Sequence, residues 1–338
     1  PRSDYVELAR VLDADVMDMQ YLTEQGTAVS RALASRDRVV PAQIIDAFVR
    51  NRRYRHIVAR ADRLGLPLAL LFKVTRGRRD LVLISVWLSR RKKAVFLSQL
   101  RVHSHLRAII NYGSVQRTLA ATRLGVPPGK LHLCLQPVDE RFWHPAAETI
   151  EPVGDRVLSV GFEARDFRTL ARALDGLDVT ADLAIGSTVL GPSGEVEAAF
   201  GGRARDAVAA GSAARIRIHR QVPPRVLRRL YAQARVVVVP LHDVDFDAGV
   251  TVIAEAMAMG KAVVVTRTQG QVDVVREGET GLYVPPGDPA ALRAAIQHLL
   301  DNPDVAERMG RAGRAVVESR HTLDGWVSAV AGIVHGRR

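Results

Sequence analysis

The chain has 338 residues, 47% of them hydrophobic, which is enough for two domains with cores of their own. Its single cysteine, Cys134, excludes an internal disulfide and is typical of a reducing compartment, so we expect a cytoplasmic protein. The longest apolar runs, 81–88 and 236–241, are shorter than the ~18 residues that span a bilayer, and no secretory signal is visible at the start.

The excess positive charge lies in one half of the chain. The formal net charge is +12; residues 1–150 hold 25 Lys and Arg against 13 Asp and Glu, and residues 151–338 hold 23 of each. A basic face concentrates anionic partners such as a membrane surface, although a simply solvated Arg-rich face fits as well. The runs 50–55 and 90–93 are local clusters. Since no RNA-binding or zinc-finger signature accompanies them, we expect no specific nucleic-acid binding.

The first half predicts a mixed α/β domain over residues 1–147. Short apolar runs predict strands at 68–72, 81–88 and 108–112, and a helix is predicted at 91–106. The segment 86–97 places aromatic side chains around a cation cluster, as interfacial segments do; a strand that leads into an ordinary amphipathic helix is the alternative.

The second half alternates β-branched runs with helical patterns. Strands are predicted at 157–160, 181–185, 214–218, 236–239 and 262–266, and helices at 165–174, 224–233, 252–259 and 288–300. This alternation predicts βαβ units and a parallel sheet, with ligands near the carboxyl ends of the strands. The likeliest linker is 148–155, and a last helix at 323–334 is expected to pack back on the first domain through Trp326.

An acidic loop between two predicted strands carries the candidate chemistry. Asp247 lies in the loop, Gly249, Val250 and Thr251 open a short helix, and Glu255 lies within that helix. Ionised carboxylates accept hydrogen bonds from sugar or ribose hydroxyls, and helix-end amides bind phosphate. Glycine lets the main chain approach a phosphate closely. The plain alternative is a capping Asp and a solvent-facing Glu.

Residues 151–330 resemble the C-terminal domain of GT-B glycosyltransferases of family 4, or glycosyltransferase group 1. The matching stretches are VLSVGFEARDFRTLARAL, RRLYAQARVVVVPL, DAGVTVIAEAMAMGKAVVVT, GETGLYVPPGD and the helices at 291–309. The resemblance implies two Rossmann-like domains whose parallel sheets face each other across a cleft. Residues 1–147 would bind the acceptor, 148–320 the nucleotide sugar, and 321–338 would form the last helix.

The resemblance also assigns roles to residues. The family has two glutamates separated by seven residues, and here Asp247 and Glu255 stand at those places. By resemblance, Asp247 holds the donor sugar and Glu255 the ribose. Arg165, after Gly161, would neutralise the leaving diphosphate; the family's frequent Arg after the glycine is Phe162 here.

The resemblance extends into the first half. The segment 136–145 resembles the one that joins the family's two domains, with Gln136 and Pro137 in place of the usual Asn and Gly. The match fades before residue 60, so the first strand and its glycine-rich loop are expected to lie upstream of Pro1 or to be missing. A catalytic histidine is expected near Val86 but is absent there, and neither His103 nor His105 is assigned as a base.

Two rival motifs are weaker. Asp243 and Asp245 after a strand, with His242, resemble the metal-binding acids of GT-A glycosyltransferases, but the flanking segment has the metal-free GT-B pattern. A dinucleotide-binding dehydrogenase is disfavoured because no GxGxxG follows a predicted strand.

The expected function is therefore a retaining, metal-independent glycosyltransferase without a cofactor, which uses a nucleoside-diphosphate sugar as donor. The acceptor would be lipid-linked or anionic, and the basic first half is a candidate contact with the anionic inner face of a membrane. The alternatives are an epimerase or phosphorylase of the same fold, or a degenerate member that binds an anionic surface without catalysis.

Overall fold

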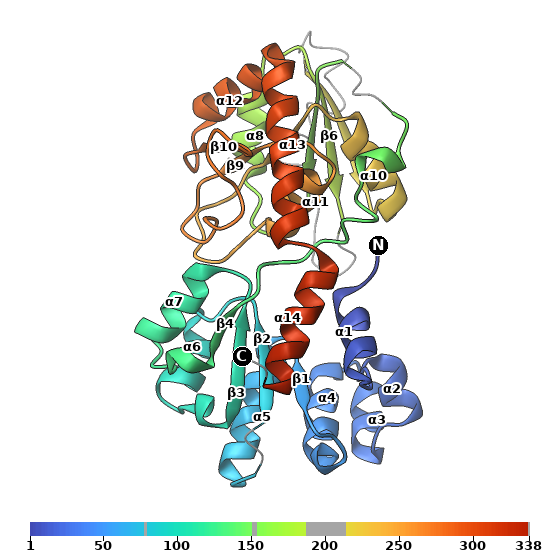
Figure 1. The fold of residues 1–338 in the computed structure, drawn as a ribbon, viewed down its shortest axis with the longest axis vertical. Helices are drawn as coiled ribbons and strands as arrows, with labels where there is room; N and C mark the ends of the chain where they lie inside the picture. Colours follow the sequence, from blue (N-terminus) through green and yellow to red (C-terminus); the bar gives the residue numbers. More distant parts are fainter. Residues whose placement is uncertain (78–79, 151–153, 187–213, 337–338) are drawn as a thin grey trace. The chain divides into compact units, whose positions relative to one another are not determined.

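The computed structural model describes residues 1–77, 80–150, 154–186 and 214–336 (Figure 1). The chain divides into two compact units, each built as an α/β layer structure. The N-terminal unit contains Arg2–Leu135 and Asp324–Arg338, and the C-terminal unit contains Gln136–Leu323 together with Pro1. In the described ranges, no helix carries an apolar stretch long enough to cross a bilayer.

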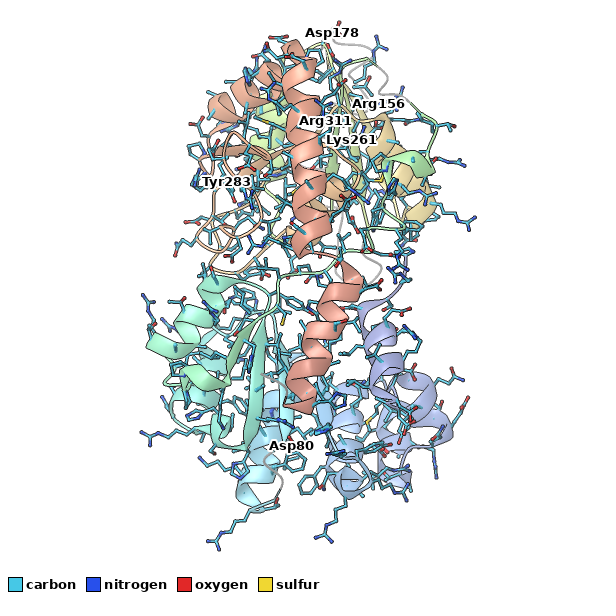
Figure 2. The ribbon with its side chains drawn as sticks, in the orientation of Figure 1. Asp80, Arg156, Asp178, Lys261, Tyr283 and Arg311 are labelled. Atoms are coloured by element: carbon cyan, nitrogen blue, oxygen red, sulfur yellow. The ribbon has the colours of Figure 1, made fainter. Side chains whose placement is uncertain are left out.

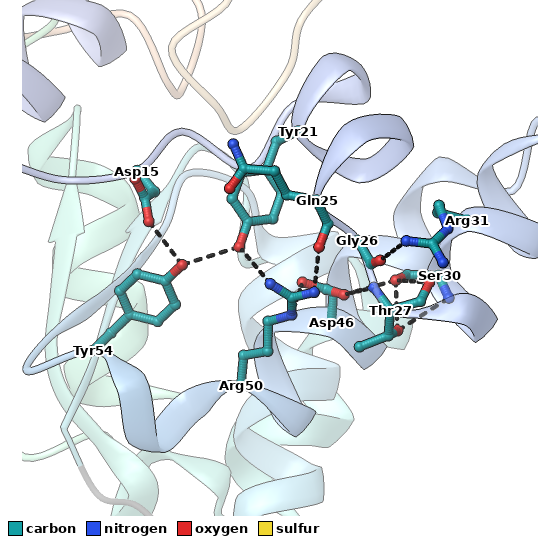
Figure 3. Close-up of polar contacts among 10 residues, drawn as sticks. All are labelled: Asp15, Tyr21, Gln25, Gly26, Thr27, Ser30, Arg31, Asp46, Arg50 and Tyr54. Carbon is teal, nitrogen blue, oxygen red and sulfur yellow. Dashed lines mark hydrogen bonds and ion pairs between the residues drawn. The ribbon is translucent and has the colours of Figure 1, made fainter.

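The N-terminal unit begins with helices rather than with a strand. They are α1 (Asp4–Leu12), α2 (Met19–Glu24), α3 (Ala28–Ala34), α4 (Val39–Val49) and the 3-10 turn η1 (Asn51–Arg53). Asp46 of α4 is fully buried and accepts hydrogen bonds from Thr27 N and Ser30 Oγ, each at 2.7 Å (Figure 3). Its other partner is Arg50, at 3.4 Å. These bonds fix α3 against α4, because a buried carboxylate is stable only when it is paired.

A four-stranded parallel sheet follows in the order β1-β2-β3-β4. The strands are β1 (Ile57–Ala59), β2 (Leu81–Ser85), β3 (Leu106–Asn111) and β4 (Leu131–Leu133). The helices and turns between them are α5 (Asp62–Val74), α6 (Arg91–Ser98), η2 (Val102–His105), α7 (Ser114–Thr122) and η3 (Pro128–Lys130). Buried side chains of α5, β2, β3 and α7 form one apolar core.

The strand predicted at 68–72 is wrong, since these residues lie inside α5. Leu66, Ala69 and Phe72 of this helix are almost fully buried at a spacing of three residues, which turns one helical face to the core. A short apolar run fits a buried strand and a buried helix equally well, so periodicity could not separate them. The helix predicted at 91–106 ends at Ser98 and is followed by the turn η2.

The last helix, α14 (Leu323–His335), belongs from Asp324 onward to the N-terminal unit. The ring of Trp326 stacks on Tyr112, with centroids 6.2 Å apart and planes inclined by 16°. Arg2 Nη1 bonds Asp324 Oδ1 at 2.6 Å at the start of the helix. Both ends of the chain therefore contribute to this unit.

The C-terminal unit contains a six-stranded parallel sheet in the order β10-β9-β8-β5-β6-β7. Its strands are β5 (Arg156–Val160), β6 (Thr180–Ile185), β7 (Arg215–Arg220), β8 (Val236–Val239), β9 (Ala262–Thr266) and β10 (Gly281–Val284). Its helices are η4 (Pro145–Ala147), α8 (Phe167–Leu174), α10 (Pro224–Gln233), α11 (Val250–Ala258), α12 (Pro289–Asp301) and α13 (Pro303–Arg320). The predicted strands of this half are present, and β10 is an additional one.

The units divide after Leu135 and after Leu323, not at the expected positions 147 and 320. The segment 136–147 is bonded to the C-terminal unit. Val138 N donates to His321 O at 2.9 Å, and Arg314 Nη1 of α13 donates to Glu140 O and Trp143 O at 3.1 and 2.8 Å. Part of the predicted linker 148–155, residues 151–153, lies outside the described ranges.

The strand order reverses at β5, which pairs with β6 on one side and with β8 on the other. At such a switch point the loops after the two central strands diverge, so a crevice opens beyond their carboxyl ends. The loop after β5 begins at Gly161, and the loop after β8 contains Asp247 and Gly249. The fold therefore directs the candidate residues to the edge where ligands of parallel sheets bind.

Candidate functional site

Arg165 is at the centre of the site, on the loop between β5 and α8. Arg165 is only 3% exposed. Its guanidinium donates to main-chain carbonyls, from Nε to Val160 O at 3.0 Å and from Nη1 to Glu163 O at 2.9 Å. An antiparallel bridge with Leu241 joins this loop to the loop after β8. Burial lowers the pKa of Arg165 to about 10, which leaves the side chain charged at neutral pH.

Two glycines lie directly against this guanidinium. A Cβ added to Gly161 would come within 2.7 Å of Arg165 Nη2, and one added to Gly249 would be 3.4 Å from Nη1 and 2.7 Å from Val239 Cγ1. Both glycines have positive φ, +92° and +76°, a region that disfavours other residues. The arginine thus lies between the turn at Gly161 and the turn at Gly249, where the sequence predicts a close approach to a phosphate.

Gly249 is also the N-cap of α11. Its carbonyl accepts the first helical hydrogen bond, from Ile253 N at 3.0 Å, and Val250 N donates to Asp247 O at 3.3 Å. The amides of Val250 and Thr251 precede the first intrahelical donor, Ile253 N, and lie at the positive end of the helix dipole. Anionic groups are therefore stabilised at this helix end, next to the Arg165 guanidinium.

The first candidate acid, Asp247, is buried with 9% exposure. Burial raises the pKa of its carboxyl to about 6, its own amide opposes the rise, and the nearby charge of Asp273 adds to it. Asp273, on the loop after β9, is a neighbour that sequence reasoning missed. The sequence feature that could have identified Asp273 is its place after a predicted strand, on the same edge of the sheet as Asp247.

The second candidate acid, Glu255, is half-buried on α11. Its Oε2 accepts a hydrogen bond from Tyr231 Oη at 2.9 Å. Burial raises the pKa of Glu255 to about 7, against the lowering effect of the tyrosine hydroxyl. Tyr231, which sequence reasoning also missed, is fully buried on α10 and interacts electrostatically with Arg165.

The helices that carry these two groups are tied together. Lys261, which Figure 2 labels, lies just after α11. Its Nζ donates to Ala232 O of α10 at 2.8 Å. The edge of Trp143 packs against the ring of Tyr231, with centroids 5.5 Å apart at 82°. Tyr231 therefore bonds Glu255 and lies within electrostatic range of Arg165, whereas a charge that acts on Asp247 is that of Asp273.

The rival acidic pair takes part in a loop contact. Asp243 accepts from Gln269 N and Nε2, each at 3.3 Å, which joins the loops after β8 and β9. His242 Nδ1 lies 3.9 Å from Asp166 Oδ2. Within the ranges that the structure describes, no three His, Cys, Asp or Glu residues are grouped closely enough to hold a metal ion.

Comparison with known proteins places the site in a family context. Residues 162–302 match the family model described as Glycosyl transferases group 1. The D-inositol 3-phosphate glycosyltransferase of Thermomonospora curvata is 36% identical over 144 residues, which cover 43% of this chain and 32% of that protein. The capsular polysaccharide biosynthesis glycosyltransferase CapM of Staphylococcus aureus is 34% identical over 90 residues, 27% of this chain and 23% of that protein. The chain thus spans about a third or less of these curated relatives.

Solved structures extend the likeness to both units. Sucrose-phosphate synthase of Thermosynechococcus elongatus gives a TM-score of 0.73 at 19% identity, over 88% of this chain and 78% of that chain. HepE of Anabaena in complex with UDP-glucose gives 0.69 at 16% identity, over 88% and 82%. At these identities the likeness shows the fold, and the expected GT-B fold is confirmed. In sequence, residues 162–302 are similar to the glycosyl transferases group 1 family.

Proposed function

We propose that this chain moves a sugar from a nucleoside-diphosphate sugar to an acceptor, with retention at the anomeric carbon and without a metal ion, as a family 4 enzyme. One observation carries the proposal: the buried Arg165 guanidinium lies against Gly161 and Gly249 at the switch point of the sheet. Within the described ranges its guanidinium donates to main-chain carbonyls, so its charge remains available to an anion. The structure of HepE with UDP-glucose supports a nucleotide-sugar donor for this fold.

The proposed chemistry is charge stabilisation at the leaving group. The bond between the anomeric carbon and the diphosphate oxygen breaks, and Arg165 with the Val250 and Thr251 amides stabilises the negative charge that develops there. The acceptor oxygen bonds to the same face of the sugar, and its proton passes to the departing phosphate. Asp247 would hold the sugar hydroxyls and Glu255 the ribose hydroxyls through their acceptor oxygens.

The test is transfer from a panel of nucleotide sugars, beginning with UDP-glucose, with Arg165→Ala and Arg165→Lys. The alanine variant should lose about 100-fold or more in turnover, as for removal of one donor to a developing oxyanion, and lysine should recover part of it. Arg311→Ala is the matched control, since Arg311 is a 72% exposed arginine of α13 (Figure 2). Wild-type turnover in Arg165→Ala would refute the proposal.

The same panel distinguishes the alternatives. A transferase releases a nucleoside diphosphate and forms a glycosylated acceptor. An epimerase returns an isomerised nucleotide sugar, a phosphorylase requires phosphate, and a degenerate member binds without turnover.

We also propose an anionic acceptor that reaches the site at an anionic membrane surface, through the basic N-terminal unit. The first turn of α6 carries Arg91, Lys92 and Lys93 without an acidic residue, although cations are unfavourable at this end of a helix. Before it, the Arg90 guanidinium lies 4.2 Å from the centroid of the Trp87 ring, and Val86 is 43% exposed. Relatives named for D-inositol 3-phosphate, a phosphate ester, are consistent with an anionic acceptor.

Sedimentation with phosphatidylglycerol vesicles tests the membrane part. Binding at low salt should weaken with added salt and fall in the combined Arg90→Ala, Arg91→Ala, Lys92→Ala variant, because each removed cation loses its attraction to the anionic surface. Removal of equal charge from exposed arginines of α13 should leave it unchanged. No binding at low salt would exclude this surface.

A further inference from the structure

The hydroxyl of Tyr231 donates its hydrogen bond to Glu255, an acid of the proposed donor site. Its side chain is fully buried in α10, and Oη donates to Glu255 Oε2 at 2.9 Å. A buried tyrosine hydroxyl requires a partner, and main-chain carbonyls can satisfy this requirement in a core. Here the partner is the carboxylate of α11 that the proposed function assigns to the ribose.

The remaining oxygen of Glu255 is left for a ligand. Within the described ranges, the hydrogen bond from Tyr231 is the one that its carboxylate makes, so Oε1 has no protein donor. The titratable side chain that acts on it is Tyr231 from α10. Because the torsion that turns a Glu carboxylate is broad, one fixed oxygen determines where the other points.

The Tyr231 ring also connects the two ends of the proposed ligand. Arg165, assigned to the diphosphate, interacts electrostatically with the hydroxyl that holds Glu255. Trp143 packs on the ring from the segment after the unit boundary. A shift of Tyr231 would therefore move the Glu255 carboxylate that its hydroxyl holds.

We infer that Tyr231 is a positioning residue of the donor site, whose hydroxyl orients the Glu255 carboxylate so that Oε1 faces the vicinal hydroxyls of the nucleoside ribose. The inference rests on the proposed function. Tyr231 also favours the ionised carboxylate, because a donor hydrogen bond stabilises the charged form. Without it, Glu255 would take up a proton at higher pH and would lose acceptor capacity.

UDP binding measured by calorimetry from pH 6 to 9 tests the inference with Tyr231→Phe, Glu255→Gln and the double variant. Tyr231→Phe should weaken binding about 10-fold at pH 7, as expected for loss of one hydrogen bond to a charged group. The loss should shrink at pH 9, where the carboxyl ionises even without the tyrosine. Tyr54→Phe is the matched control, since Tyr54 Oη also donates to a carboxylate, Asp15 Oδ2 at 2.8 Å, in the N-terminal unit.

The outcomes separate the two claims. Equal UDP binding by wild type and Glu255→Gln would overturn the ribose role in the proposed function. Weakened binding in Glu255→Gln with wild-type affinity and pH profile in Tyr231→Phe would overturn the inference alone. A loss in Tyr231→Phe that is independent of pH and persists in the Glu255→Gln background would indicate mere packing and would also overturn it.

If Tyr231→Phe does not fold, 3-fluorotyrosine placed at position 231 keeps the ring and acidifies the hydroxyl. The stronger donor should then move the pH midpoint of UDP binding downward. An unchanged midpoint would count against Tyr231 as a positioning residue.

Discussion

Replacement of Glu255 by Gln should stabilise the ligand-free chain above pH 7 while it weakens donor binding. Gln has nearly the same shape, and its carbonyl can still accept the hydrogen bond from Tyr231 Oη, which is 2.9 Å from Glu255 Oε2. What the substitution removes is a carboxylate that burial makes costly to ionise, since it raises the pKa to about 7.

The magnitude follows from linkage. The pKa of Glu255 rises from 4.5 in the unfolded chain to about 7 in the fold, so between these values the folded state holds a proton that the unfolded state has lost. Stability therefore falls as pH rises through this window, by about 1.4 kcal/mol per unit. The cost reaches about 3 kcal/mol above pH 7, an upper figure because Glu255 keeps some solvent exposure.

Urea denaturation at pH 5, 6, 7 and 8 measures this effect. Wild type and Glu255→Gln should differ little at pH 5 and by up to about 3 kcal/mol at pH 8, with the variant more stable. Glu318→Gln is the control, because that glutamate is 54% exposed on α13. A Glu255→Gln chain that is less stable than wild type at every pH would refute the reasoning.

Two further predictions concern backbone approach and the last helix. Gly161→Ala should lower the UDP-glucose transfer rate at least 10-fold and lower the free energy of unfolding in urea by about 1–3 kcal/mol, because its Cβ would lie 2.7 Å from Arg165 Nη2 at a φ of +92°. Gly154 also has a positive φ but has open space around its Cβ, so Gly154→Ala should leave the transfer rate unchanged. Trp326→Ala should lower the free energy of unfolding by about 3–5 kcal/mol and speed amide hydrogen exchange in β3, because the stack on Tyr112 is lost. Unchanged exchange in β3 would contradict a role for this stack.

The strands of the C-terminal unit could be predicted because their sequence leaves little choice. Val236–Val239 is a β-branched run that is buried on both faces, and a central strand of a parallel sheet requires this. The helix predicted at 288–300 begins at Pro289, and the carboxylate of Asp288 before it accepts from Ala290 N and Ala291 N. In these places local propensity and tertiary environment favour the same structure.

The candidate site was only partly predictable. Gly161 and Arg165 could be selected by resemblance to the family and Gly249 from its place at a helix start, but their mutual contact depends on the strand order, which a sequence does not display. Tyr231 and Asp273 were missed for the same reason. Their partners lie on other elements, Glu255 on α11 and Asp247 on the loop after β8, and no local pattern connects them.

The site combines groups that each destabilise the empty fold. Among the residues that the structure describes, the acceptors of the Arg165 hydrogen bonds are main-chain carbonyls, and burial opposes the ionisation of Asp247 and Glu255. A buried charge costs free energy unless it is paired, so Asp247→Asn and Glu255→Gln should each stabilise the chain, whereas Arg165→Ala would also remove the donor to the Val160 and Glu163 carbonyls. Their opposite requirements match one ligand, because a diphosphate would neutralise the arginine and sugar hydroxyls would donate to the acids. The ligand would then supply the partners that these buried charges lack in the empty fold, and the free energy of pairing them would contribute to binding. Such a site can hold an activated sugar tightly and still favour departure of its phosphate.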